Sequence, residues 1–187
     1  MTKNKGFTLV ELLIVVAILA VLSTATVLIL DPANILRETR DAQRLNDMAS
    51  ISSAISLYLA TAANPAFSTA LDTAGNCTID SNGATAVTPD YDGGTCTVTA
   101  ERAVGATGWV NVLLANTSGG SPLSVLPMDP QNTVTNYYVF EADSATTKFE
   151  LNANMESTKY AAAYEPTAKD GGDNTAVYEV GTNLTLL

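Results

Sequence analysis

The sequence predicts an α+β fold, in which one long N-terminal helix packs its second half against a small antiparallel β-sheet. A dense apolar run fills residues 7–30, and a helical pattern of apolar residues follows it to about residue 63. Short apolar stretches separated by turn residues fill the remainder, 64–187. One helix followed by successive strands is typical of an α+β domain with an antiparallel sheet.

The apolar run of residues 7–30 is long enough to cross a membrane. As a helix it measures roughly 36 Å, against about 30 Å for the hydrocarbon core of a bilayer. Lys3 and Lys5 precede the run, so the positive-inside tendency predicts a cytoplasmic N-terminus and an outside head. The alternative is a cleaved secretory signal with its cleavage site at residues 23–25, but the apolar run continues past that point to Leu30.

Glu11 is an acid inside this apolar run. A carboxylate in hydrocarbon costs at least about 2–3 kcal/mol, so an acid there indicates a function. The alternative is that Glu11 lies near the cytoplasmic interface and extends its carboxylate into water at little cost. The physical argument alone leaves both interpretations open.

Residues 5–11 read Lys-Gly-Phe-Thr-Leu-Val-Glu, and they resemble the class III signal of type IV prepilins and type II secretion pseudopilins. In that family a membrane peptidase cuts after the residue equivalent to Gly6 and N-methylates the new first residue, here Phe7. The resemblance implies that the leader 1–6 is removed. It also implies that Glu11 of an incoming subunit meets the Phe7 amine of a docked one during assembly.

The same resemblance implies a structural subunit of an extracellular type IV pilus-like filament. Its partners would be copies of itself, the prepilin peptidase, an inner-membrane assembly platform and, through residues 7–30, the bilayer. Before assembly the chain would be a single-pass membrane protein with its head outside, and afterwards part of an extracellular filament. Two alternatives remain: a pseudopilin of a type II secretion system, and a membrane-anchored exported binding domain that does not polymerise. The sequence around Glu11 favours a filament subunit over that binding domain.

Residues 31–63 are predicted to be a stalk and head-packing helix. Asp31-Pro32 predicts either a kink or a new helix with Asp31 as its N-cap. An apolar stripe at steps of three and four predicts burial of the later half, at Leu45, Met48, Ile51, Ile55, Leu59 and Ala62. The same face carries Arg37, Asp41 and Arg44 earlier on, which predicts a bare stalk with local Arg37–Asp41 and Arg44–Asp47 pairs.

The composition of the head argues against nucleic-acid binding and catalysis. The chain has a net charge of −10, and acids far outnumber Lys and Arg beyond Ala60, so its surface repels phosphate. No histidine is present, which removes the commonest general base, and no catalytic motif is recognisable. We therefore expect a protein that is not an enzyme, and this argues against a third alternative, an exported enzyme.

Two sets of side chains in the head are candidates for a disulfide and for a metal site. Cys77 and Cys96 are too few for a zinc site without histidine, so in an exported head they predict a disulfide that contributes about 3 kcal/mol. Asp170, Asp173 and Asn174 form an oxygen-rich turn that is a candidate for Ca²⁺, ranked first because some pseudopilins bind calcium in a C-terminal loop. No other cofactor is expected.

Strands are predicted at 95–99, 109–114, 136–140, 148–151, 176–180 and 184–187.

Overall fold

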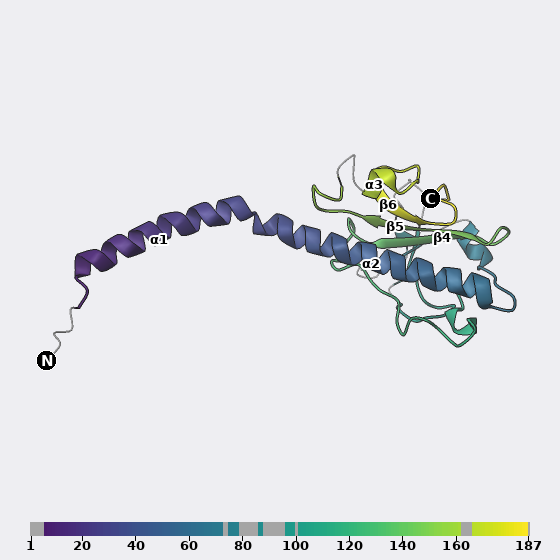
Figure 1. The fold of residues 1–187 in the computed structure, drawn as a ribbon. Helices are drawn as coiled ribbons and strands as arrows, with labels where there is room; N and C mark the ends of the chain where they lie inside the picture. The colour runs from purple at the N-terminus through teal and green to yellow at the C-terminus, as the bar shows by residue number, and fades with distance from the viewer. Residues whose placement is uncertain are drawn as a thin grey trace. The chain divides into compact units, whose positions relative to one another are not determined.

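The computed structural model describes residues 6–72, 75–78, 86–87, 96–99, 101–161 and 166–186. The predicted leader therefore lies outside the described residues except for Gly6. The chain divides into two compact units, residues 1–37 and 38–187. Figure 1 traces both units, and each is described by itself below.

The first unit consists of helix α1 and the beginning of helix α2. Helix α1 (Leu9–Leu30) starts at its N-cap Thr8 and ends at Asp31, which adopts a left-handed conformation with φ 37°. The carboxylate of Asp31 then accepts a hydrogen bond from the Asn34 amide (3.3 Å), and α2 (Pro32–Thr61) begins. Of the two alternatives for Asp31-Pro32, a new helix capped by Asp31 is confirmed.

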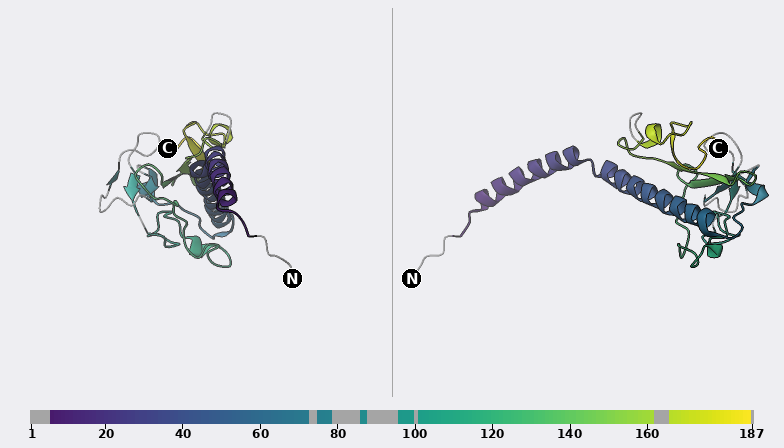
Figure 2. Two further views of the ribbon diagram at one scale, coloured as in Figure 1. Left: turned by 90° about the vertical axis from the view of Figure 1, so that its left-hand side faces the viewer. Right: turned by 45° about the vertical axis from the view of Figure 1, so that its right-hand side comes forward.

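In the second unit, the remainder of α2 packs against a β-sheet, as the right-hand view of Figure 2 shows. Most of the predicted stripe faces the core: Met48, Ile51 and Ile55 are fully buried, and Leu59 and Ala62 pack at its margin. The prediction for Leu45 was wrong, since Leu45 is only half-buried and lies outside this core. Such burial contributes roughly 1.5–3 kcal/mol for each large aliphatic side chain. The helix ends at Thr61, close to the predicted end, ahead of Asn64-Pro65.

Within the described residues, the sheet has six strands in the order β2-β3-β1-β4-β5-β6. The strands are β1 (Asn76–Cys77), β2 (Ala86–Val87), β3 (Cys96–Val98), β4 (Tyr138–Asp143), β5 (Lys148–Asn154) and β6 (Val177–Gly181). All neighbours are antiparallel except β1 and β3, which run parallel. The α+β class is confirmed, but the purely antiparallel sheet was wrong, because the connection between β1 and β3 is long enough for a parallel pair.

The two faces of β4–β6 differ in chemistry. One face presents aromatic and aliphatic side chains to α2, among them Phe140, Phe149 and Leu151. The other presents Glu150 and Asn152 of β5 and Glu179 of β6, all of them buried. The short helix α3 (Pro166–Lys169) contacts β6 (Figure 1). Alternation of side chains along a strand places each set on its own face.

Two predicted strands are wrong. Residues 109–113 form no strand, although Trp109, Val110 and Val112 are buried; tight turns hold them, with the Val112 amide donating to the Val110 carbonyl. A short 3₁₀ helix, η2 (Leu114–Asn116), follows, and another, η1 (Thr69–Asp72), precedes β1. Residues 184–186 are also irregular. Short apolar runs predict burial more reliably than they predict a sheet.

Candidate functional site

The acid of the N-terminal segment caps its own helix. The Glu11 carboxylate accepts hydrogen bonds from the Thr8 amide and the Thr8 hydroxyl, both at 2.8 Å. In return the Glu11 amide donates to the Thr8 hydroxyl at 3.2 Å. This reciprocal capping box satisfies donors at the helix start and sets the carboxylate beside the positive end of the helix dipole. Glu11 thus lies at the end of α1 nearest Phe7.

Helix α1 exposes apolar side chains along its whole length. Phe7 is 90% exposed, Leu9 79% and Ile29 82%. Each polar side chain near its centre is satisfied within the helix, because Ser23, Thr24 and Thr26 donate to carbonyls four residues earlier. The described residues include one helical stretch long and apolar enough to span a membrane, and α1 is its apolar part. Such a surface suits surroundings without water.

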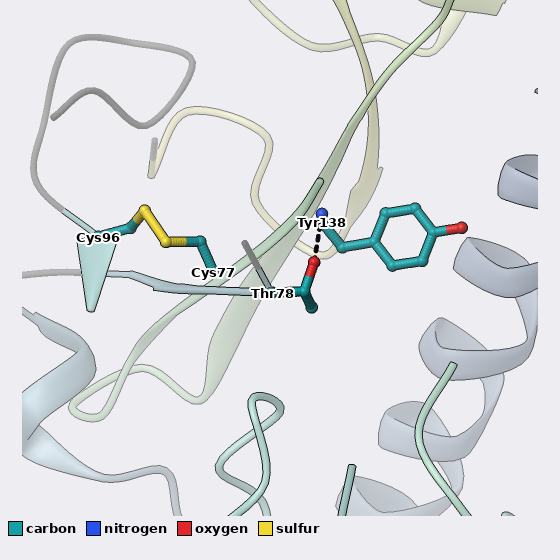
Figure 3. Close-up of a disulfide and its surroundings, with 4 residues drawn as sticks. All are labelled: Cys77, Thr78, Cys96 and Tyr138. Atoms are coloured by element: carbon teal, nitrogen blue, oxygen red, sulfur yellow. Dashed lines mark hydrogen bonds between the residues drawn. A yellow bond between two sulfur atoms is a disulfide. The ribbon is translucent and has the colours of Figure 1, made fainter. Parts of the chain in front are cut away.

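In the head, Cys77 and Cys96 form the predicted disulfide (Figure 3). Their Cα atoms lie 5.7 Å apart, within the range that a disulfide requires. Both residues are fully buried and pack with Tyr137 and Val139. Next to the bridge, Thr78 binds Tyr138 of β4 twice: the Tyr138 amide donates to the Thr78 hydroxyl, and the Thr78 amide donates to the Tyr138 carbonyl, both at 3.0 Å. The disulfide therefore joins β3 to a segment anchored on the central sheet.

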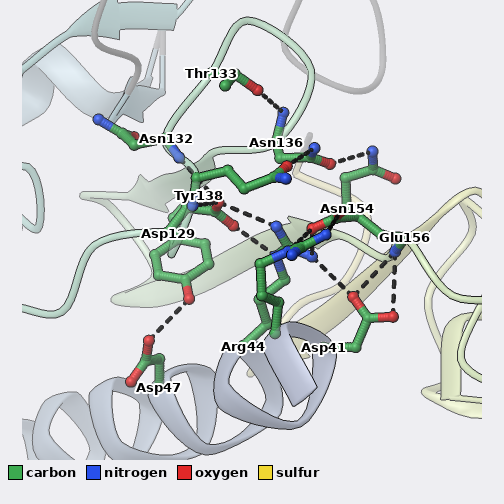
Figure 4. A network of polar contacts seen from close by, with 12 residues as sticks. Asp41, Arg44, Asp47, Asp129, Asn132, Thr133, Asn136, Tyr138, Asn154 and Glu156 are labelled. Carbon is green, nitrogen blue, oxygen red and sulfur yellow. Dashed lines mark hydrogen bonds and ion pairs between the residues drawn. The ribbon is translucent and has the colours of Figure 1, made fainter. Parts of the chain in front are cut away.

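A buried ion network joins α2 to two loops of the head (Figure 4). Arg44 and Asp41 are fully buried and pair at 2.8 Å. Arg44 also binds both carboxylate oxygens of Asp129, at 2.6 and 3.1 Å, and pairs with Glu156. Arg40 adds a second pair to Glu156 through both of its carboxylate oxygens, at 2.9 and 2.6 Å. A planar guanidinium suits such bidentate contacts.

This network corrects the predicted bare stalk. Asp41 accepts backbone hydrogen bonds from Glu156 and Ser157, and Asp129 accepts them from the amides of residues 131 and 132. The head therefore covers α2 from Asp41 onward. The predicted Arg44–Asp47 pair is also wrong, since Arg44 bonds elsewhere and Asp47 accepts from the Tyr138 hydroxyl at 2.8 Å.

The environment shifts the pKa values of the network. Burial alone would lower the pKa of Arg44, but the hydrogen bonds and charge of Asp129, with Glu156 and Asp41, outweigh it and raise the pKa. Burial alone would raise the pKa of Glu156, but the hydrogen bonds from Arg40 and Arg44 hold it below its usual value. Arg44 and Glu156 are therefore both charged at neutral pH.

Asp129 and Glu156 were not identified from the sequence. A usable signal existed on α2, because Asp41 and Arg44 continue the three-and-four spacing of Met48, Ile51 and Ile55. Charged residues on a core stripe indicate buried pairs. The sequence gives no comparable signal for their partners: Asp129 lies 85 residues from Arg44, and Glu156 lies 115 residues from Asp41.

The three candidate calcium ligands do not converge in this structure. The carboxylate of Asp170 accepts from the Gly172 amide at 3.1 Å and from the Glu179 amide at 2.9 Å. Asn174 accepts from the Ala176 amide at 3.0 Å, and Asp173 is exposed. Within the described part of the chain, no group of three or more His, Cys, Asp or Glu side chains is arranged to hold a metal ion. Calcium binding by this turn stays a prediction.

Under the same turn lie two buried acids. Glu150 accepts from the Leu186 amide at 2.7 Å, and Glu179 accepts from the Asn174 amide at 3.1 Å. Burial, followed by the hydrogen bond and charge of Glu150, raises the pKa of Glu179 to about 8. This acid pair therefore joins the sheet to the turn and to the C-terminal segment.

Comparison with known proteins adds a match at the N-terminus. The family model of the prokaryotic N-terminal methylation motif matches residues 1–27, which carry the class III signal of type IV pilins and pseudopilins. No curated protein and no solved structure matches the chain. The motif and the apolar helix α1 together fit a membrane-anchored precursor of the type IV pilin-like or pseudopilin kind.

Proposed function

We propose that the chain is the structural subunit of an extracellular type IV pilus-like filament, which polymerises through α1 after its leader is removed. The observation that carries this proposal is the pairing of the methylation motif with an apolar helix that exposes its large side chains and contains one acid. A helix with that surface needs cover from lipid or from other helices. The bilayer supplies the cover before assembly, and neighbouring copies of α1 supply it afterwards.

Cleavage between Gly6 and Phe7 prepares the subunit to leave the bilayer and to pack against neighbouring copies of α1. It removes the basic leader with Lys3 and Lys5 and creates a positive amine on Phe7, which is then N-methylated. The carboxylate of Glu11 lies at the same end of α1, with Thr8 as its local hydrogen-bond partner. In the filament, the Phe7 amine of one subunit and the Glu11 carboxylate of the next offset each other's cost of leaving water.

The ion network of the head supports the same proposal. Because buried pairs hold Asp41 and Arg44 of α2 to the loops at 129 and 156, a pull on α2 is transmitted to the head. The disulfide adds a covalent constraint to the sheet. A filament subunit in an oxidising, extracellular setting benefits from both devices.

The proposal is tested first by N-terminal and intact-mass spectrometry of protein extracted from the membranes of its native host. We expect a mature chain that begins with N-methylated Phe7. The matched control is Gly6→Leu, in which a side chain at residue 6 meets no neighbouring atom, so the helix should form as before while the cleavage site changes. A mature start near Thr26 would instead support a secretory signal peptide and reject the filament.

A further inference from the structure

Two acids lie buried in contact on the face of the sheet that is turned away from α2. Glu150 of β5 is 0% exposed, and Glu179 of β6 is 1% exposed. Gly181 lies opposite Glu150 in the register of the two strands, so Glu179, two residues earlier, is a diagonal neighbour of Glu150 on the same face. Their carboxyl groups are within hydrogen-bond reach of each other. Two acids buried in this way cannot both carry a charge at low cost.

A proton shared by the two carboxyl groups accounts for their contact. A carboxylate only accepts hydrogen bonds, whereas a protonated carboxyl group also donates one. The Oε1 atom of Glu179 is buried and accepts from no donor within the described residues. The neighbouring carboxyl group of Glu150 supplies such a donor when it carries the proton.

The surroundings of Glu179 favour the protonated form. Burial raises its pKa to about 8, and the hydrogen bond and charge of Glu150 and the charge of Asp170 act in the same direction, against the hydrogen bond from the Asn174 amide. The described parts of β4, β5, α3, the turn and β6 that surround the pair carry further ionisable groups, namely Glu141, Asp143, Lys148, Lys169, Asp173 and Tyr178. Both lysines are exposed, so water and salt screen their charges.

Each acid also holds a different segment of the chain. Glu150 accepts from the Leu186 amide at 2.7 Å, and Glu179 accepts from the Asn174 amide at 3.1 Å. Gly172 packs directly on Glu179, because a Cβ atom at residue 172 would clash with the Glu179 carboxyl group. The pair therefore fastens both the turn at 172–174 and the C-terminal segment at 182–186 to the last two strands.

We propose that Glu150 and Glu179 form a pH-sensitive latch, in which one shared proton holds the turn at 172–174 and the segment at 182–186 against the sheet. In alkaline solution this proton passes to water and leaves two buried carboxylates. Their repulsion and their need for hydration favour a state in which Glu179 turns toward solvent and displaces Gly172 and Asn174. The latch belongs to the head, so it operates with or without filament assembly.

The direction of the effect follows from the two pKa values of Glu179. Its usual value is 4.5 and its value in the folded head is about 8, so between these limits the folded state holds one more proton than the unfolded state. The stabilisation is fully present below about pH 4.5 and is lost as the pH rises through about 8. The equilibrium constant for unfolding should rise about tenfold per pH unit in this window. The chain contains no histidine, the side chain whose ordinary pKa lies there.

The test is urea titration of the full-length chain in detergent micelles, followed by Trp109 fluorescence, at values from about pH 5 to about pH 9. The parent should show the tenfold rise per pH unit. Glu179→Gln keeps an oxygen for the Asn174 amide and offers an N–H group to Glu150 without taking up a proton, so its unfolding constant should be nearly independent of pH. The matched control Asp173→Asn removes an exposed acid of the turn and should follow the parent.

A parent whose unfolding constant does not change with pH in this window would overturn the proposal. An unchanged slope in Glu179→Gln would also overturn it, and would assign the proton to another buried acid such as Asp47, whose pKa burial also raises.

Hydrogen exchange of the parent tests the latch without any substitution. The protection of the Leu186 and Asn174 amides, relative to the unstructured chain, should fall above about pH 8. The Tyr138 amide, which donates to the Thr78 hydroxyl at 3.0 Å in the central sheet, should keep its protection. Unchanged protection of Leu186 and Asn174, or an equal loss at all three amides, would contradict a local release of the turn and the C-terminal segment.

Discussion

The two units of the chain distribute polarity in opposite ways. In the first unit, large apolar side chains such as Phe7, Ile18 and Leu30 are at least half exposed, and one acid caps the helix start. In the second, Arg44 and Asp41 are fully buried beneath a surface that carries most of the chain's negative charge. The first unit leaves its apolar surface uncovered, whereas the second satisfies the buried charges around Arg44 with its own residues.

This difference distinguishes helix α1, which needs a partner to cover it, from the ion network of the head, which does not. Helix α1 can be stable only where lipid or another helix covers it. The free energy gained by covering its apolar surface therefore depends on an assembly. All ion pairs of Arg44 form within residues 38–187, so they contribute to the free energy of folding of the head. Mutations in the two units should therefore show their effects in different assays: those in α1 in assembly, and those in the head in unfolding.

The largest expected effect on the head is that of Arg44→Ala. It leaves the carboxylates of Asp41 and Asp129 buried without their cation, which should lower the free energy of unfolding by about 3–5 kcal/mol. Urea titration followed by the fluorescence of Trp109, the chain's one tryptophan, measures the head specifically. The matched control is Arg40→Ala: this side chain is 27% exposed, so its loss should cost about 1 kcal/mol or less. Equal effects would mean that burial does not set the energy of the network.

Removal of the disulfide comes next. Paired replacement of Cys77 and Cys96 by Ser should cost about 3 kcal/mol, because the unfolded chain loses a crosslink that closes a loop of 19 residues. The same urea titration, run on the parent with and without reductant, checks the value independently of the substitution. Insertion of α1 into the membrane should be unchanged, and its loss would contradict the separation of the two units.

A smaller effect concerns pH. Because Arg40 and Arg44 hold the pKa of Glu156 below its usual 4.5, against the effect of burial, the folded state gives up this proton more readily than the unfolded state. The stabilisation is therefore fully present above about pH 4.5 and is lost as the pH falls through the lower folded pKa. Thermal melts at decreasing pH should show this loss in the parent and a flatter profile in Glu156→Gln. Parallel profiles would show that Glu156 is not the responsible group.

The sequence was sufficient for the features that depend on local pattern. The apolar length of α1, the stripe of Met48 to Ile55 and the pairing of the two cysteines follow from spacing and composition, and all are confirmed. It was not sufficient where a residue's environment is built by distant segments. The charges at Asp41 and Arg44 suggested a solvated face because their partners, the Glu156 amide and Asp129, approach from other parts of the chain.

The sheet illustrates the same limit. Strands β4 and β5 follow from alternating apolar residues around a short turn, whereas β1 and β3 are two and three residues long and pair in parallel across a long connection. A strand at 95–99 was predicted and is confirmed as β3, but a strand of two residues such as β1 carries no periodic signal, so the parallel partner of β3 was not predicted. Trp109 to Val112 carries an apolar pattern but lies in turns, since burial there is achieved without a ladder of hydrogen bonds.

The most direct test of the central claim is the yield of sheared filaments from Glu11→Val, measured by immunoblot beside the total membrane-bound subunit. Valine suits a membrane helix, so the subunit should insert and be cleaved, while loss of the carboxylate that meets the Phe7 amine lowers filament yield by at least about tenfold. Glu11→Asp, one methylene shorter, should give an intermediate yield. Glu11→Gln can still accept from the Thr8 amide but carries no charge, so it should resemble Glu11→Val. Parent-level filament yield from Glu11→Val would show that the carboxylate only caps its own helix at the membrane interface, and would contradict this account.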